Sequence, residues 1–307
     1  MTSVSFTLRQ LEYFDAVASA GTLAAAAERC RVSPSALTVA LDELERHLGV
    51  QLLVRRKGRG VVLTATGARL LRHARSVLAD AEVLADDASR SGAELSGRLS
   101  FGCFTTLTPF FVPPIVQGFR DEYPLVSLDV VEGSMADLQE MLLQGRIDVA
   151  LLYAVDTAHA LVFETVREYR PHVIVGTEHR LADRTSVSLR ELVDEPLIEV
   201  DVPPTRHNTH ALFSDFGLRP RIGQVTTSYE TARCLVGYGL GYAVLFQRPG
   251  TSLTYGGHEV VELELDDPVP LTAVGLARPD GAPRTARYDA LRRLLSVGEF
   301  AMSAADG

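Results

Sequence analysis

The chain has 307 residues, more than one typical domain holds, and 46% of them are hydrophobic, which is enough for a proper core. It has no apolar run of about eighteen residues, so we expect no membrane span. Its three cysteines (Cys30, Cys103 and Cys234) are too scattered to predict a disulfide framework. Because the sequence also shows no N-terminal secretory signal, we expect the protein in the cytoplasm. The formal net charge of −9 excludes a protein that is basic throughout.

Two helices are predicted before residue 31. Apolar residues at helical spacing fit the buried face of the first helix, which ends near Gly21; these residues are Leu8, Leu11, Phe14 and Val17. Thr22 can cap the second helix, and the small residues that follow it have a high helix propensity. Their size lets a neighbouring helix approach closely.

A third helix is predicted after a short turn at residues 31–32. Ser33 offers an N-cap oxygen, Pro34 suits the first helical position, and Gly49 ends the helix. Its buried face is formed by Leu37, Leu41, Leu44 and Leu48. Two helices joined by such a turn are typical of the helix-turn-helix of DNA-binding proteins, although an ordinary α-hairpin is the alternative.

A wing is predicted after this helix pair. Residues 52–63 form two apolar runs around a glycine-rich basic turn, which predicts a hairpin with a cationic tip. Such a tip can lie on phosphates or enter a minor groove of double-stranded DNA. A wing at this position favours the DNA-binding interpretation over the α-hairpin.

The predicted DNA-contacting surface combines the start of the third helix with the wing. Hydroxyl groups there can bond to base edges or phosphates, and methyl groups can touch a thymine methyl, but no Arg or Gln is available for a bidentate base contact. We therefore expect much of the specificity to come from groove shape and wing arginines. The candidate DNA-binding residues are Arg31, Ser33, Pro34, Ser35, Thr38, Val39, Arg55, Arg56, Lys57 and Arg59.

The charge distribution supports this interpretation. Residues 1–79 contain eleven basic and six acidic residues, a balance of +5, which leaves −14 for the rest of the chain. A basic head on an acidic body confines phosphate binding to the head. Asp42, Glu43 and Glu45 would repel phosphate, so the later half of the third helix should face away from the DNA.

A long helix is predicted from Gly67 to about Ala88. Its apolar residues alternate at spacings of four and three, which is typical of a coiled-coil seam and favours a homodimer. The seam residues are Leu70, Ala74, Val77, Ala81, Leu84 and Ala88. The alternative is a helix that packs on its own domain.

Beyond a polar hinge at residues 89–97, short apolar strands alternate with helices, which predicts an α/β fold. We expect a parallel sheet with helices on both faces. The predicted strands are 99–102, 126–131, 147–153, 173–176, 197–200, 242–246 and 269–277, and the main helices are 109–120, 135–143 and 285–296.

Residues 8–67 resemble the N-terminal domain of LysR-type transcriptional regulators. The resemblance runs through Leu8-Arg9-Gln10-Leu11-Glu12-Tyr13-Phe14, Ala26-Ala27-Glu28-Arg29, Val32-Ser33, Ala36-Leu37, Leu44-Glu45, Leu48-Gly49-Val50 and Leu63-Thr64. The chain departs from the usual pattern at Pro34-Ser35, at Val39 and Ala40, and at Leu53.

The resemblance implies a winged helix-turn-helix at 1–64, a linker helix for dimerisation at 65–91, and an effector domain at 97–302 that resembles a periplasmic binding protein. Lobe I would comprise 97–162 and 268–302, and lobe II 163–267. The protein would be a homodimer or homotetramer, regulated by a small-molecule effector between the lobes at the carboxyl ends of strands.

The effector site is predicted from polar loops that follow strands. Hydroxyls and free N–H groups at a helix start suit an anion such as a carboxylate. The alternatives are helix caps for the hydroxyls, a surface position for Arg206 and a core position for Tyr153. The candidate residues are Cys103, Thr105, Thr106, Ser134, Tyr153, Thr205, Arg206, Thr227 and Ser228.

Two other functions remain open. Cys103 at a helix start would have a more acidic thiol and can serve a redox-sensing regulator, an idea that unchanged activity of Cys103→Ser would eliminate. A DNA-anchored enzyme is disfavoured because we find no common catalytic motif, and we expect no enzymatic activity and no cofactor. His207 and His210 alone do not predict a metal site.

Overall fold

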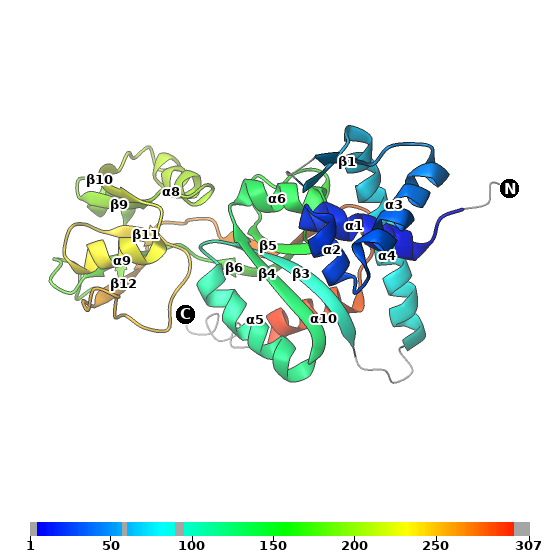
Figure 1. Ribbon diagram of the computed structural model, residues 1–307. Helices are drawn as coiled ribbons and strands as arrows, with labels where there is room; N and C mark the ends of the chain where they lie inside the picture. Colours follow the sequence, from blue (N-terminus) through cyan, green and yellow to red (C-terminus); the bar gives the residue numbers. More distant parts are fainter. Residues whose placement is uncertain (1–4, 57–59, 90–94, 298–307) are drawn as a thin grey trace.

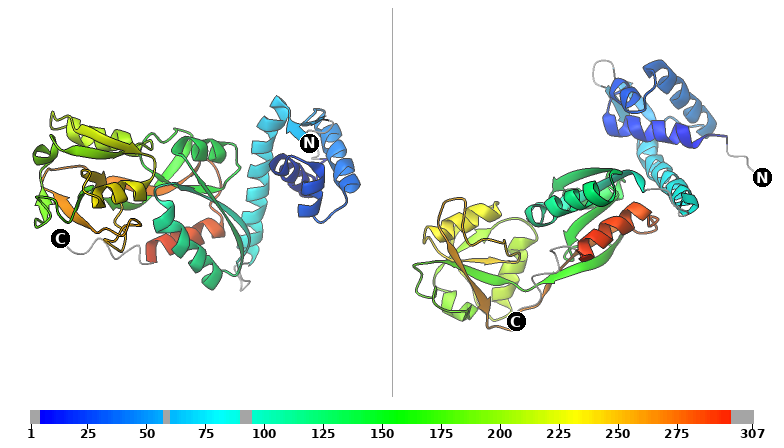
Figure 2. Two further views of the ribbon diagram at one scale, coloured as in Figure 1. Left: turned by 60° about the vertical axis from the view of Figure 1, so that its left-hand side comes forward. Right: turned by 90° about the horizontal axis from the view of Figure 1, so that it is seen from below.

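The computed structural model describes residues 5–56, 60–89 and 95–297. The chain forms a small helical head, a long helix, and two α/β lobes arranged in a row (Figure 1). The long helix lies between the head and the first lobe in both further views (Figure 2). Within the described residues, no helix combines the length and the hydropathy that a membrane crossing requires.

The head contains the three predicted helices and the predicted hairpin, which are α1 (Leu8–Ala20), α2 (Leu23–Arg29), α3 (Pro34–Leu48), β1 (Leu53–Arg56) and β2 (Gly60–Leu63). The side chain of Thr22 accepts a hydrogen bond from the Ala25 N–H, and Ser33 accepts one from the Ala36 N–H. Gly21 and Gly49 end α1 and α3 in the left-handed conformation, with φ of 68° and 67°. The predicted caps are therefore confirmed.

The hydrophobic core of the head includes residues of the long helix α4 (Ala65–Ser89). Leu71 and Ala74 of α4 are buried against the apolar faces of the head helices. In contrast, Val77 and Leu84 are 43% and 72% exposed. The first two seam residues, the partly buried Leu70 and the buried Ala74, thus pack on their own domain, as the alternative interpretation held. The predicted burial of Leu8 is wrong, since its side chain is 46% exposed at the start of α1.

Lobe I is built on a five-stranded sheet in the order β4-β3-β5-β13-β6. Helices α5 and α10 cover one face of the sheet and α6 covers the other (Figure 1). The bounds are β3 (Ser96–Phe104), α5 (Thr108–Glu122), β4 (Leu125–Gly133), α6 (Met135–Leu143), β5 (Val149–Tyr153), β6 (Leu161–Tyr169), β13 (Thr272–Pro279) and α10 (Ala286–Val297).

Lobe II has a four-stranded sheet in the order β11-β7-β12-β8, and the parallel pair β10-β9 joins it through a bridge between Leu197 and Tyr242. The bounds are β7 (His172–Gly176), β8 (Ser186–Val187), α7 (Leu189–Leu192), β9 (Pro196–Val200), α8 (Thr205–Ser214), β10 (Arg221–Thr226), α9 (Tyr229–Gly237), β11 (Ala243–Leu245) and β12 (Val260–Leu265).

The prediction of wholly parallel sheets is wrong. In lobe I, β13 runs antiparallel to both β5 and β6, because the chain re-enters this sheet from lobe II in the opposite direction. The predicted lobe boundary at residue 162 is also wrong. Strand β6 pairs with β13 as far as Tyr169, so the first crossing to lobe II lies between Tyr169 and His172. Residues 298–302 of the predicted lobe I lie outside the described residues.

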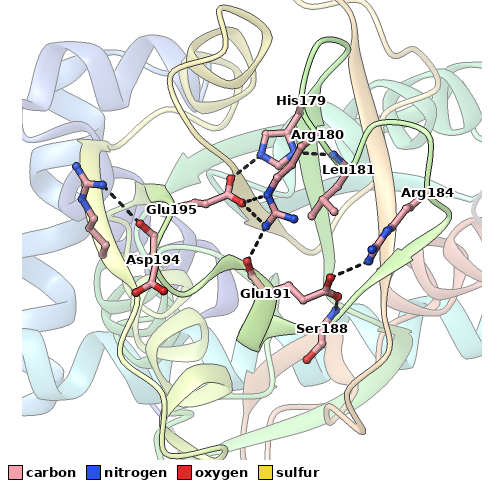
Figure 3. Close-up of polar contacts among 9 residues, drawn as sticks. His179, Arg180, Leu181, Arg184, Ser188, Glu191, Asp194 and Glu195 are labelled. Carbon is pink, nitrogen blue, oxygen red and sulfur yellow. Dashed lines mark hydrogen bonds and ion pairs between the residues drawn. The ribbon is translucent and has the colours of Figure 1, made fainter.

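A network of hydrogen bonds and ion pairs links neighbouring segments of lobe II (Figure 3). The Glu195 carboxylate bonds to His179 Nε2 at 2.5 Å and also pairs with Arg180, while Glu191 pairs with Arg184 at 2.7 Å. These contacts fasten the loop after β7 to α7 and to the segment before β9. Because Arg180 and Arg184 are half exposed, each ion pair contributes little, roughly 0–1 kcal/mol.

Candidate functional site

The outer surface of α3 is exposed at its N-terminal half. Ser33, Pro34, Ser35 and Val39 are exposed and Thr38 is half-buried. The Ser33 hydroxyl already serves as the N-cap and lies 3.0 Å from the Ser35 hydroxyl. These five candidate residues therefore lie together, at the helix end that can enter a major groove.

Arg31 and the wing flank this surface. Arg31 is exposed and adopts a left-handed φ of 55° in the turn before α3. Arg55 forms a 2.5 Å ion pair with Asp42 of α3, so its charge offsets that of the acid. The candidates Lys57 and Arg59, and the side chain of Arg56, lie outside the described residues.

The acidic residues of α3 do not all face outward. Glu45 Oε1 accepts hydrogen bonds from the backbone N–H groups of Leu52 and Leu53, at 2.6 and 3.0 Å. Glu43 accepts one from Gln10 at 3.3 Å. The carboxylates thus fix α3 to β1 and α1, which leaves the uncharged N-terminal half as the surface that can approach phosphate.

A second candidate site is a small cavity of about 10 Å³ between the two lobes. This volume holds about one water molecule. Thr106 contributes from lobe I, where it lies between β3 and α5. The residues that line the cavity from lobe II are Val200, Thr205, Tyr229, Leu245, Phe246 and Gln247.

Two threonine hydroxyls at this cavity lack a well-aligned hydrogen bond. Thr106 and Thr205 are 5% and 6% exposed, and neither Oγ1 makes such a bond within the part of the chain that the structure describes, although Thr106 interacts with the Tyr153 hydroxyl of its own lobe. An unsatisfied buried polar group costs roughly 1–3 kcal/mol, so it calls for an explanation. Thr106 precedes α5 and Thr205 opens α8, and neither helix has a side-chain cap in the described structure.

Aromatic and amide side chains connect the lobes beside the cavity. Gln247 Nε2 of lobe II donates to the Tyr153 hydroxyl of lobe I, and the Tyr229 hydroxyl donates to the Gln247 carbonyl oxygen at 2.6 Å. The Phe110 and Tyr229 rings meet edge to face across the lobes, with centroids 5.5 Å apart. Burial raises the pKa of both tyrosines, so both hydroxyls remain protonated.

The other predicted effector residues lie outside the cavity lining. Ser134 and Ser228 cap α6 and α9, which is the alternative considered for these hydroxyls. The Thr105 hydroxyl donates to the Gly133 carbonyl at 3.1 Å, and Thr227 is exposed. Arg206 is 54% exposed, and its side chain pairs with two acids of lobe II, Glu199 at 3.4 Å and Asp201 at 3.3 Å.

Five cavity residues escaped the sequence analysis: Val200, Tyr229, Leu245, Phe246 and Gln247. Weak signals exist for two of them. Tyr229 opens a helix immediately after a threonine-serine run, and Gln247 follows an apolar strand. Both are positions at which polar side chains reach the carboxyl edge of a sheet.

The predicted acidic thiol of Cys103 is wrong. Cys103 lies within β3 and is fully buried, whereas α5 begins only at Thr108. Burial raises the pKa of the thiol to about 12, because the apolar surroundings disfavour the thiolate. A thiol with this pKa is poorly reactive toward oxidants.

A metal site is not apparent in the described ranges, where we find no group of three or more His, Cys, Asp or Glu side chains positioned around a common point. The Nε2 atom of His210 is instead bonded to the buried carboxylate of Glu199.

Both domains match known family models. Residues 8–68 match the bacterial regulatory helix-turn-helix protein, lysR family, and residues 92–297 match the LysR substrate binding domain. The chain belongs to the LysR family of bacterial transcriptional regulators. It is therefore a DNA-binding transcriptional regulator with an effector-binding domain, which confirms the predicted family, fold class and general function.

Individual LysR-family proteins support this assignment. The HTH-type transcriptional regulator AlsR of Bacillus subtilis is 34% identical over 237 residues, which cover 76% of this chain and 78% of AlsR. The structure of HinK, a LysR family transcriptional regulator from Pseudomonas aeruginosa, is 34% identical and covers 95% of this chain and 99% of its own, with a TM-score of 0.63. A full-length OxyR variant from the same organism shares the fold, with a TM-score of 0.76 at 23% identity, and the match covers 95% of this chain and 98% of OxyR.

Proposed function

We propose that this LysR-family regulator responds to a small anionic effector, such as a carboxylate, that binds between the two lobes. The observation that supports it best is the pair of buried hydroxyls without a well-aligned hydrogen bond, Thr106 and Thr205, on opposite lobes of one cavity. As a bacterial transcriptional regulator that binds DNA, it would act in the cytoplasm.

Backbone groups around the cavity favour an anion. The starts of α5 and α8 lie beside Thr106 and Thr205, and neither has a side-chain cap among the described residues. The start of a helix carries a partial positive charge and unpaired N–H groups, which attract a carboxylate. Arg206, which follows Thr205 in the sequence, is engaged by Glu199 and Asp201, so hydroxyls and N–H groups would hold the effector.

Binding must open the cavity. A cavity of about 10 Å³ is too small for a carboxylate, so the two lobes would have to separate for the effector to bind. An effector that prefers a more open arrangement would shift the population toward it, in proportion to its difference in affinity for the two states. The Phe110–Tyr229 and Gln247–Tyr153 contacts are the ones that such opening would change.

The effector site is tested with Thr205→Val in the full chain. A thermal-shift screen of small carboxylic acids identifies a stabilising ligand, and calorimetry then measures its Kd. We expect Thr205→Val to weaken binding roughly tenfold or more, since a hydrogen bond to a charged group contributes about 1.5–3 kcal/mol. Thr185→Val, at an exposed threonine of the same lobe that is outside the cavity lining, is the matched control. Equal Kd values for wild type and Thr205→Val would rule out this site.

We also propose that the exposed end of α4 pairs with a second copy of the chain, giving a homodimer or homotetramer. Val77 and Leu84 are exposed on this helix, whereas Leu71 and Ala74 are buried in the core of the head. We expect Leu84→Asp to shift the sedimentation coefficient toward that of a monomer. Leu240→Asp, at another exposed leucine, should leave the sedimentation coefficient of the oligomer unchanged. An unaltered oligomer in Leu84→Asp would contradict pairing through this helix.

A further inference from the structure

The N-terminal half of α3 presents an uncharged surface with one large apolar side chain. Pro34, Ser35, Ala36 and Val39 are all exposed, and Val39 reaches 57% exposure. Ser35 and Ala36 stand four and three residues before Val39, so the three side chains share one face of the helix. This face points outward from the core leucines of α3.

The polar groups around Val39 are engaged in the head itself. The Ser33 hydroxyl caps the helix, and Asp42, one turn beyond Val39, is paired with Arg55 at 2.5 Å. The pairing lowers the repulsion that a free carboxylate would exert on nearby phosphates. Beside the Ser33, Ser35 and Thr38 hydroxyls, the face of α3 that can meet base edges therefore presents methyl and methylene surface, with Val39 as its one large apolar side chain.

Base pairs present only one apolar group in the major groove, the C5-methyl group of thymine. We propose that Val39 is a specificity-determining residue that contacts a thymine C5-methyl, so that the regulator selects operators with thymine at one fixed position. An exposed valine is ordinary elsewhere on a surface. Here it lies about one and a half turns into a capped helix that carries the DNA contact, which is where base edges are reached. The proposal rests on the DNA-binding function of the head.

The test compares thymine with deoxyuridine, which differs only by the C5-methyl group. The wild-type full chain first enriches a preferred duplex from a random library. Each thymine of that duplex is then replaced singly by deoxyuridine. We expect one position at which the replacement weakens wild-type binding roughly fourfold, the effect of losing about one buried methyl group. The variant Val39→Ser should bind the thymine and deoxyuridine duplexes equally.

Matched variants test whether the response to deoxyuridine depends on Val39 itself. Val116→Ser changes an exposed valine of α5, 44% exposed, and should keep the full wild-type response to deoxyuridine. Val39→Ala gives a second measurement if Val39→Ser binds weakly. The proposal is overturned if no thymine methyl affects wild-type binding, or if both Val39 variants still respond as the wild type does. A library that enriches no sequence would instead contradict sequence-specific DNA binding as a whole.

Discussion

Replacing Gly67 by alanine is expected to destabilise the DNA-binding head by about 2 kcal/mol. Gly67 is buried in the first turn of α4, and a Cβ atom there would lie 2.1 Å from the Leu52 carbonyl oxygen and 2.9 Å from its carbonyl carbon. Both atoms belong to the backbone, so neither can move aside as a side chain would. Such overpacking costs roughly 1–3 kcal/mol or more, and the better helix propensity of alanine offsets about 1 kcal/mol.

This overlap matters because α4 begins against the wing. The Thr64 N–H donates to the Leu52 carbonyl at 2.9 Å, and the Thr64 hydroxyl donates to the Gln51 carbonyl at 2.8 Å. The same hydroxyl accepts the Gly67 N–H. Pushing Gly67 outward would therefore loosen the joint between the head and the long helix.

The measurement is hydrogen–deuterium exchange of head peptides in the full chain. A loss of about 2 kcal/mol should accelerate exchange of the most protected amides roughly thirtyfold. Gly118→Ala is the matched control, because the atoms nearest to a Cβ at this helical glycine belong to the movable side chain of Leu294. Exchange in Gly67→Ala as slow as in the wild type would show that the Leu52 backbone can shift without cost.

The head was predictable because its signals are local. The sequence around α3 places Ser33, Pro34 and Gly49 at the positions that begin and end a helix, and the structure shows the helix between them. The wing likewise follows from a basic glycine-rich turn between two apolar runs. Leu8 shows the limit of such reasoning, since its apolar spacing was right but its position in the first turn leaves it exposed.

The lobes were less predictable because their features depend on contacts distant in sequence. The sequence of β13 itself does not predict that it runs antiparallel to β5, because its direction depends on how the chain crosses between the lobes. Arg206 has the chemistry of an anion ligand, yet its partners Glu199 and Asp201 lie on and just beyond a neighbouring strand. The cavity itself exists only where Thr106 meets lobe II.

Arg75 joins three parts of the molecule, and its removal is expected to weaken communication between them. Its Nε lies 2.5 Å from Asp15 of α1, and its terminal nitrogens donate to the Ser19 hydroxyl of the head and to the Gln144 carbonyl at the end of α6. The Arg75 side chain is only 14% exposed. This residue of α4 therefore touches both the DNA-binding head and lobe I.

Helix α6 connects this contact to the effector cavity. Its first residues follow Gly133, whose carbonyl accepts both the N–H and the hydroxyl of Thr105, the neighbour of Thr106. Its C-cap residue is Gln144, whose carbonyl accepts a hydrogen bond from Arg75. A rigid helix with one end at the cavity loop and the other at the head can transmit a shift of lobe I, provided both ends remain attached.

We expect Arg75→Ala to reduce the change in operator affinity that the effector produces. Coupling between two sites is typically about 1–3 kcal/mol, a factor of roughly 5–150, and we expect most of that factor to disappear. The measurement is the operator Kd with and without the carboxylate found by thermal shift. Because coupling is reciprocal, the carboxylate Kd with and without operator must lose the same factor.

Arg72→Ala is the control, since Arg72 lies on the same helix with an exposed side chain. Asp15→Ala is the second variant, and it removes the Asp15 acceptor of Arg75 while Ser19 and Gln144 keep their donor. We expect it to lose part of the coupling that Arg75→Ala loses, because one of the two attachments to the head remains. Wild-type coupling in both variants would mean that the lobes act on the head by another route, such as the pairing of α4 helices.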